Sequence, residues 1–333
     1  MRNSWRALCC LAPQPPLWGT CGRSCAAPGT AVTTAGPPSA RSIAPGLTIG
    51  VLCGVGAALF WAAGFVAIPR GLAAGLSPAD IAFHRFVWAG LVLLPLVVRD
   101  GLGDLGGIGW GRGLVVFLLA GPFQAVISYS GFIFAPLAHG GVIHPGSAAM
   151  FGFVLAVLVL KEPLTLRHLA GTIVIVGGLA IFAGESIVSI GGNALGGDLL
   201  FATAGLMWAL FGMLVKLWRL DSARAARVSC FFALIVFAPL HAWLYGFDTM
   251  RSVNLTENLI QVGVQGVLSG ALAMYLYSRA VVILGAGKAA IFPSLVPGLT
   301  LLIAFITLGV IPTLPQFAGL AVVMLGFWLA LRR

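Results

Sequence analysis

An arginine lies inside one of the long apolar stretches of this sequence. Arg85 stands about seven residues into its stretch, and an ionised side chain at membrane depth is costly enough to indicate a function. We expect its guanidinium either to bind a substrate carboxylate or to have a structural role. In the structural role it would reach the interface or backbone carbonyls, aided by Asp80. Both interpretations fit the sequence.

Aromatic rings and small polar groups form a second set of candidates. The aromatic members are Trp61, Tyr129, Trp208, Tyr275 and Tyr277. They could form a stacking surface for a flat or aromatic ligand, although tryptophan and tyrosine are also common at membrane interfaces. Gln124 and Ser128 lie one helical turn apart and could add a polar stripe to that surface. The set predicts a central, largely apolar binding cavity.

Two prolines in apolar stretches predict interruptions of the helices that carry them. His144–Pro145 and Phe292–Pro293 occupy equivalent places in two similar segments. Proline removes a backbone donor, and irregular backbone at membrane depth is tolerated where it is buried in protein or lines a cavity. We therefore expect both breaks to line the cavity, with ordinary packing kinks as the alternative. His144 could be pH-sensitive or an uncharged, hydrogen-bonded histidine.

The elements that position these residues are duplicated. The stretch from Val142 to Phe182 reappears as Ala290 to Ala330 at a constant offset of 148 residues, without a gap. Earlier in each half, LFWA at residues 59–62 matches LMWA at residues 206–209, so that Trp61 and Trp208 are equivalent. The register predicts two copies of one structural unit.

Composition places these units in lipid. Hydrophobic residues make up 59% of the chain and charged residues 8%, against roughly a quarter charged in soluble domains. Spans of roughly 20 apolar residues cross a bilayer as helices. The expected spans are 46–68, 78–98, 113–134, 138–160, 166–184, 197–217, 228–246, 259–278, 288–309 and 315–331.

Five spans in each half imply that the second copy enters the membrane from the opposite side. We therefore predict an all-α integral membrane protein with ten transmembrane helices in two inverted five-helix repeats. The first repeat is expected at 46–184 and the second at 197–333, with a linker at 185–196. Secondary transporters often use this plan, with the substrate site near the bilayer midplane and alternating access.

Basic residues predict the orientation of the chain. With the N-terminus placed inside, the outer loops hold only Arg70 and Arg251, whereas the inner segments hold the other Lys and Arg residues apart from Arg85. The positive-inside rule then places both termini in the cytoplasm of a multi-pass protein of the cell inner (plasma) membrane. Residues 1–45 are rich in Arg, Pro and Cys and are interpreted as a disordered leader or an over-extended start.

The sequence LKEPLTLRHLAG at residues 160–171, between two apolar spans, resembles the EamA-type repeat of the drug/metabolite transporter superfamily. The Trp-Ala pair in the first helix of each half and Arg85 in the second helix of the first half extend the resemblance over nearly all of 46–331. It implies a ten-helix exporter or exchanger of small metabolites. Val310 stands at the position of Glu162, and Arg85 has no counterpart, so a symmetric pair of glutamates is not available.

We predict a secondary transporter that exports or exchanges a small organic metabolite, amino acid-like or drug-like. The alternatives are a nucleotide-sugar or other organelle metabolite carrier and a membrane assembly subunit without transport. An intramembrane enzyme would need a cluster of catalytic or metal-binding groups, for which the apolar spans supply too few polar residues. We therefore expect no enzymatic activity, catalytic residue, metal site or cofactor.

The expected partners are a small-molecule substrate and the lipid bilayer. The formal charge of +10 is dispersed between the spans, so we expect no nucleic-acid binding. The chain is expected to be a monomer or a homodimer.

Overall fold

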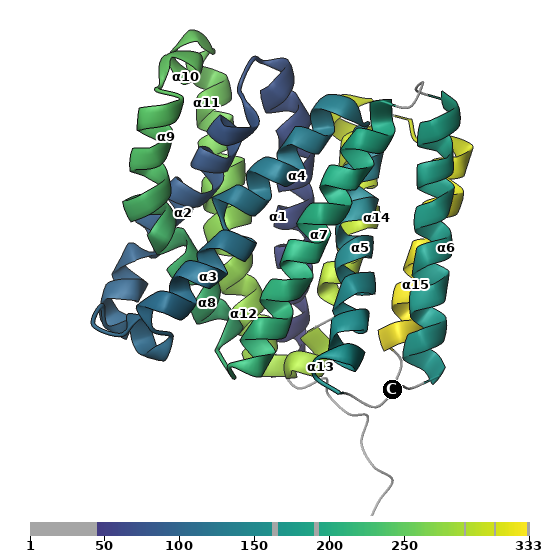
Figure 1. Cartoon of the computed structure of the whole chain (residues 1–333), viewed down its shortest axis with the longest axis horizontal. Helices are drawn as coiled ribbons and strands as arrows, with labels where there is room; N and C mark the ends of the chain where they lie inside the picture. The colour runs from purple at the N-terminus through teal and green to yellow at the C-terminus, as the bar shows by residue number, and fades with distance from the viewer. Residues whose placement is uncertain (1–44, 162–165, 190–192, 290, 310, 332–333) are drawn as a thin grey trace, which may run out of the picture. The chain divides into compact units, whose positions relative to one another are not determined.

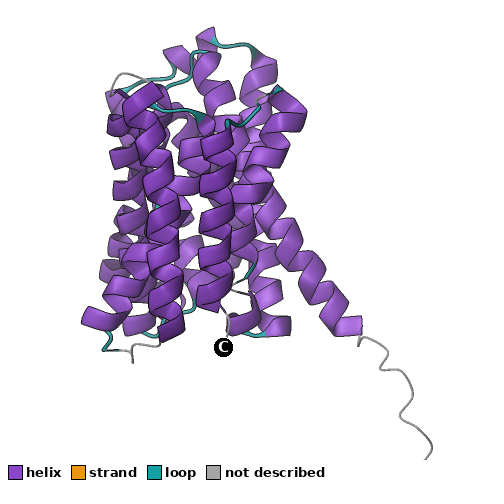
Figure 2. Cartoon of the chain, turned by 90° about the vertical axis from the view of Figure 1, so that its right-hand side faces the viewer, coloured by secondary structure: helices purple, strands orange, loops and turns teal. Residues whose placement is uncertain are grey.

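The computed structural model describes residues 45–161, 166–189, 193–289, 291–309 and 311–331. Nearly all of the predicted leader lies outside these ranges, as do Glu162 and Val310. Every regular element within them is a helix, and they contain no strand (Figure 2). Both predicted repeats belong to one compact unit, residues 43–333.

The α-helices alternate with a few 3-10 and π-helical segments, which carry the label η. The helices are α1 Pro45–Ala73, α2 Pro78–Asp100, α3 Trp110–Ala120, α4 Pro122–Phe134, α5 Leu137–Leu158, α6 Leu166–Ser189, α7 Asn193–Leu217, α8 Ser222–Phe232, α9 Ala238–Leu244, α10 Asp248–Ser252, α11 Leu255–Gln261, α12 Ala273–Leu284, α13 Ala286–Ala289, α14 Val296–Leu308 and α15 Leu314–Leu331. The η segments are η1 Leu105–Gly107, η2 Ala233–Phe237, η3 Val262–Leu272 and η4 Phe292–Leu295.

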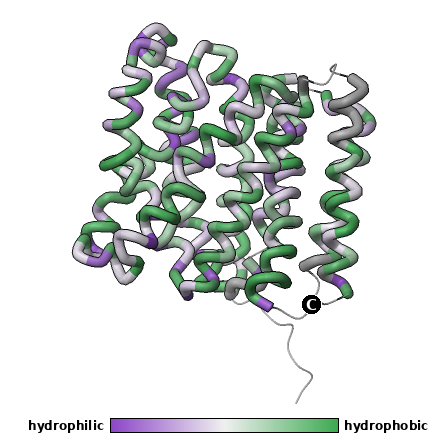
Figure 3. Tube along the Cα trace, viewed as in Figure 1, coloured by the Kyte–Doolittle hydropathy of each residue, from purple (hydrophilic) through white to green (hydrophobic). Residues whose placement is uncertain are grey.

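Several of these helices are long and apolar enough to cross a membrane. By length and composition, the described residues contain seven such stretches: Gly46–Ala73, Pro78–Asp100, Trp110–Phe134, Leu137–Leu158, Ala194–Leu217, Ser222–Leu244 and Leu255–Leu284. Three shorter apolar helices cover Leu169–Ile181, Phe292–Leu308 and Leu314–Leu329. Hydrophobic residues dominate the tube along the helices, and hydrophilic ones gather near their ends, for example around α10 (Figure 3). Multi-pass insertion follows from this pattern.

The breaks within the spans differ in part from those predicted. Phe292–Leu295 forms the 3-10 turn η4 ahead of α14, as Pro293 predicts. Helix α5, however, continues through Pro145, so the predicted interruption at His144–Pro145 is wrong. Proline removes one backbone bond, here the one to the Gly141 carbonyl, and such a loss is tolerated in a membrane helix that packs against neighbouring helices.

A break that the sequence analysis missed divides the third span. Helix α3 ends at Ala120, Gly121 is extended with φ −106° and ψ −155°, and Pro122 begins α4. A Cβ atom at residue 121 would collide with the Phe117 carbonyl oxygen, so only glycine fits. Proline suits the first position of the new helix because its missing N–H would have no partner there. The break places Gln124 in the first turn of α4.

Helix α2 is fixed at its start by a capping box. The Ser77 hydroxyl accepts from the Asp80 backbone N–H at 3.1 Å, and the Asp80 carboxylate accepts from the Ser77 N–H at 2.9 Å. The other Asp80 oxygen lies 3.0 Å from His241 Nε2 on α9. The suggestion that Asp80 assists Arg85 is therefore wrong, because this carboxylate serves the cap and the histidine.

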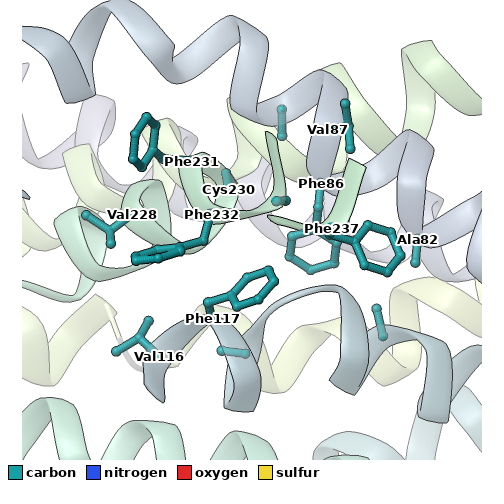
Figure 4. Close-up of a cluster of buried hydrophobic side chains, with 14 of the residues drawn as sticks. Ala82, Phe86, Val87, Val116, Phe117, Val228, Cys230, Phe231, Phe232 and Phe237 are labelled. Atoms are coloured by element: carbon teal, nitrogen blue, oxygen red, sulfur yellow. The ribbon is translucent and has the colours of Figure 1, made fainter. Parts of the chain in front are cut away.

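An aromatic cluster packs α3, α4, α8 and η2 together (Figure 4). Phe117 and Phe232 stack with centroids 5.7 Å apart, and Phe123 meets Phe117 edge to face at 5.5 Å. Helix α2 joins the cluster closely at Gly90, where a Cβ atom would press against the Cys230 carbonyl oxygen. This packing fixes the α2 backbone from which Arg85 extends.

Helices α6 and α15 lie side by side at one edge of the unit (Figure 1). Their contact is reciprocal: a Cβ atom at Gly178 would meet the Gly319 carbonyl oxygen, and one at Gly326 would meet the Gly171 carbonyl oxygen. Gly171 and Gly319 are equivalent at the 148-residue offset, and so are Gly178 and Gly326. Such exchange of equivalent partners is the pattern of a local two-fold relation.

Candidate functional site

A cavity of about 720 Å³ lies among the helices of the unit. Side chains from α1, α2, α4, α5 and α6 of the first predicted repeat line it together with side chains from α7, α8, α12, α14 and α15 of the second. All the sequence-predicted site residues except Tyr275 and Phe292 belong to the lining: Trp61, Arg85, Gln124, Ser128, Tyr129, His144, Pro145, Trp208, Tyr277 and Pro293. Residues far apart in the sequence thus meet at one place.

Arg85 is held by neutral side chains of the π-helix η3. Its Nη1 donates to the Ser269 hydroxyl at 2.6 Å and to the side-chain amide oxygen Oε1 of Gln265 at 3.2 Å. Gln265 in turn donates to the Gly64 backbone carbonyl at 2.8 Å, which links η3 to α1. Among the described residues, no carboxylate pairs with this guanidinium. Arg85 therefore brings an uncompensated positive charge to the cavity wall.

Gln124 connects three helices and orients His144. Its Nε2 donates to the Ala204 carbonyl on α7 at 3.2 Å and lies 3.0 Å from His144 Nε2 on α5. The Ala204 carbonyl can only accept a hydrogen bond, so the Gln124 atom that faces it must be the amide nitrogen, which donates. The same nitrogen faces His144 Nε2, which must therefore accept. The proton of a neutral ring then sits on Nδ1, which faces the Ser128 hydroxyl at 3.4 Å. This arrangement fits an uncharged His144.

Aromatic rings form much of the remaining wall. Trp61 contacts Tyr277 with ring centroids 5.3 Å apart and planes tilted by 53°. Phe65, one turn along α1 from Trp61, meets the His144 ring edge to face at 5.8 Å. Trp208 packs against Phe211 at 5.3 Å, although 44% of Trp208 is exposed. The repeat-related tryptophans thus stand in different surroundings.

Two of the predicted residues lie apart from the cavity lining. Tyr275 is 53% exposed on α12. Phe292 is buried against α1, where Gly54 leaves room for its ring. Tyr277 lines the cavity instead of Tyr275, because residues two apart on a helix point in different directions. Phe292 packs the turn that brings Pro293 and Ser294 to the wall.

Gln265 and Ser269 are the residues whose importance sequence reasoning missed. They lie four residues apart in an apolar stretch, and Gln261 precedes them at the same spacing. Residues at this spacing share one helix face, so the three side chains form a polar stripe. Gln261 donates to the Ala67 carbonyl at 2.9 Å, as Gln265 does to that of Gly64. Spacing alone could have revealed the stripe, whereas its packing on α1 follows from tertiary contacts.

One end of the cavity reaches the surface. Ser222, exposed at the start of α8, and Val157, near the end of α5, both belong to the lining. At the opposite side lie Ile68 and Tyr129, which are buried. The lining therefore includes an exposed side chain at the end of the bundle where α5 ends and α8 begins. The described part of the chain contains no cluster of three or more His, Cys, Asp or Glu that could hold a metal ion.

Comparison with known proteins identifies the family. The sequence model of the EamA-like transporter family matches the chain twice, at residues 48–184 and 195–332. The chain belongs to the EamA-like transporter family. As a member, it is a multi-pass membrane transporter, and the two matches fall on the two halves of the sequence duplication. The family and the cavity point to the same kind of activity.

Two individual proteins resemble this EamA transporter. The uncharacterized transporter YyaM of Bacillus subtilis (strain 168) is 24% identical over 263 residues, which cover 75% of this chain and 83% of YyaM. A protein of known crystal structure is 18% identical, with a TM-score of 0.58, and the match covers 84% of this chain and 95% of that chain. At this identity the second likeness shows the fold alone.

Proposed function

We propose that this EamA transporter moves a small organic metabolite across the cytoplasmic membrane by alternating access, in export or exchange. The observation that carries the proposal is the cavity of about 720 Å³, to which both predicted repeats contribute side chains. Secondary transporters bind substrate at such an interface between repeats. The volume lies within the range of about 300–1,000 Å³ of small-molecule sites.

The proposal includes ten spans in two inverted repeats of five, with both termini in the cytoplasm. The reciprocal glycine contacts of α6 and α15 support the two-fold relation, and the positive-inside rule supports the orientation. With this orientation the accessible end of the cavity near Ser222 faces the cytoplasm. The described conformation then corresponds to the inward-facing state of the cycle.

Counterflow tests this proposal. The full chain is reconstituted in liposomes, and exchange is measured with labelled aromatic and aliphatic amino acids, organic acids, nucleosides and cationic dyes. Saturable exchange of one class above empty liposomes is expected. No exchange of any class by folded protein would contradict the proposal, and exchange restricted to nucleotide sugars would replace it by the carrier alternative.

Two glycines allow a matched test of whether the substrate passes through this cavity. Gly152 lines the cavity and Gly177 does not, and a Cβ atom at either residue would meet no neighbour within 4 Å. Gly152→Trp should fill the cavity and abolish counterflow, whereas Gly177→Trp should retain it. Equal activity of the two variants would show that the substrate does not pass through this cavity.

A further inference from the structure

We infer that the cavity is selective for organic monoanions: a carboxylate, or an acid of similar shape, carried on a flat apolar body without a cationic group. The inference rests on the proposed function, because it names the substrate class of the same cavity. Three features carry it: the charge and bonding of Arg85, the distance from Arg85 to the aromatic wall, and the polar composition of the lining.

The first feature is a cation in a largely apolar wall. Burial of an ionised group without an opposite charge is costly, and an anion that binds beside it offsets that cost. Nη1 of Arg85 donates to Ser269 and Gln265, and the Tyr129 hydroxyl is a further partner of the guanidinium. A guanidinium carries five N–H donors, more than these three partners require, and its planar fork has the geometry that binds two carboxylate oxygens at once.

The second feature is the place on α1 that the side chain of Arg85 reaches from α2. A Cβ atom at Gly64 would lie 3.3 Å from Arg85 Nη1, so the guanidinium lies directly beside this glycine. Trp61 is three residues earlier, which corresponds to about 4.5 Å along the helix axis. The Trp61–Tyr277 pair therefore stands roughly one helical turn from the guanidinium. A carboxylate joined to a ring by a short linker matches this separation.

The third feature is the absence of an acid from the described lining. Among the described residues that line the cavity, Arg85 is the one charged side chain, and the other polar groups are neutral hydroxyl, amide, imidazole and indole groups. An ammonium group of a zwitterion would have no carboxylate partner there and would be repelled by the guanidinium. The lining therefore discriminates against cations and amino acids and favours simple acids.

Ligands that share one phenyl body and differ in charge test the inference. Binding to the full chain in detergent is measured by calorimetry for 3-phenylpropanoate, phenylalanine, 2-phenylethylamine and 3-phenylpropan-1-ol. The anion should bind about 10- to 100-fold more tightly than the neutral alcohol, as a charge-assisted hydrogen-bonded pair requires. The zwitterion and the amine should bind more weakly than the anion.

Arg85→Gln should remove the preference for the anion, whereas Arg279→Gln should retain it. Arg279 is an exposed arginine on α12 outside the cavity lining, so it controls for loss of one positive charge. Because Arg85 also braces η3, the thermal unfolding of each variant is measured alongside binding. If Arg85→Gln does not fold, the ranking of the four ligands on the unaltered protein still decides the question.

Counterflow of 2-phenylethanesulfonate, which stays ionised and so crosses lipid slowly, separates the inference from the proposed function. Saturable exchange of this anion, together with preferred binding of 3-phenylpropanoate, supports both. Exchange of the amine or the amino acid in preference to the anion would overturn the inference and leave transport standing. If no compound of either panel binds or exchanges, the inference and the proposed function both fail.

Discussion

Gln124 makes bonds that reach two neighbouring helices. Its amide nitrogen donates to a carbonyl on α7 and to the ring of His144 on α5, and the glycine-proline break before α4 places it there. In lipid, a buried polar group has no water to replace a lost partner, so such a residue fixes the relative position of the helices that it joins. This geometry fits a neutral His144 whose Nε2 accepts from the Gln124 amide.

Gln124→Leu should destabilise the protein. The substitution leaves His144 Nε2 without its donor and removes the link to the Ala204 carbonyl, which keeps its own helical bond, and a buried unsatisfied group costs about 1–3 kcal/mol. Thermal unfolding in detergent checks this. Ser130→Ala on the same helix is the control, since its hydroxyl bonds only to the Val126 carbonyl of its own helix at 2.8 Å. Equal unfolding temperatures of the two variants would show that the Gln124 bonds contribute nothing to stability.

At the scale of elements, helix α2 is tied at both ends to the segment formed by α8, η2 and α9. Asp80 pairs with His241 near the start of α2, and Asp100 pairs with Arg227 at its end, at 2.6 Å. The Asp80 pair is buried, whereas the Asp100 carboxylate is a quarter exposed, since its side-chain accessibility is 25%. The two ends of this helix pair should therefore differ in strength.

Asp80→Ala should cost about 3–5 kcal/mol of unfolding free energy, because it breaks a buried pair and removes a helix cap. Asp100→Ala should cost about 1 kcal/mol or less, as expected for partly exposed ion pairs. Denaturant unfolding of the two variants in the same detergent measures the difference. A larger loss for Asp100→Ala would contradict the order of strength that burial implies.

The π-helix η3 packs tightly against α2 through glycine. A Cβ atom at Gly270 would lie 2.8 Å from both the Cβ atom of Ala89 and the carbonyl oxygen of Arg85, and the backbone cannot yield as a flexible side chain would. Gly270→Ala should therefore destabilise by about 1–3 kcal/mol through overpacking. Thermal unfolding checks this against Gly263→Ala in the same segment.

Gly263 serves as the matched position because a Cβ atom there would meet no neighbour within 4 Å. Alanine favours helix over glycine by up to about 1 kcal/mol, so Gly263→Ala should be neutral or stabilising. The two alanine substitutions should thus have opposite signs. Destabilisation by both would indicate that η3 tolerates no added bulk, independent of its contact with α2.

Much of the element order could be predicted from hydropathy and from the duplication, because apolar length alone marks a span in lipid. The breaks were harder. Pro145 and Pro293 are equivalent in sequence, yet only Pro293 interrupts its helix, and the break in the third span depends on Gly121 beside Pro122. Whether a proline breaks a helix depends on the residues that pack around it, and a single sequence does not say which residues those are.

The candidate cavity could be predicted only in part. Residues with unusual polarity for an apolar stretch, such as Arg85 and Gln124, indicated a cavity wall. The choice between Tyr275 and Tyr277 required the rotation of α12, and the partners of Arg85 required the packing of η3 on α2. Helix rotation and pairing follow from tertiary contacts, which periodicity in an almost uniformly apolar helix specifies weakly.

At the scale of the whole molecule, duplication and charge both favour the proposed orientation. The repeats exchange equivalent contacts at α6 and α15, and basic residues gather in the loops that the proposed topology places inside. A second copy inserted in the opposite direction can meet the first across a two-fold axis in the membrane plane. In the proposed mechanism, one repeat moves against the other, and access to the cavity between them alternates.

Two exposed aspartates provide a matched test of this orientation. Asp104, between the second and third spans, should face the cytoplasm, and Asp248, in α10, should face outward. Asp104→Cys and Asp248→Cys are each made in a chain whose natural cysteines are replaced by serine. In intact cells a membrane-impermeant maleimide should label only Asp248→Cys, and permeabilisation should expose both thiols. Labelling of Asp104→Cys alone in intact cells would reverse the topology, and the accessible end of the cavity near Ser222 would then face outward.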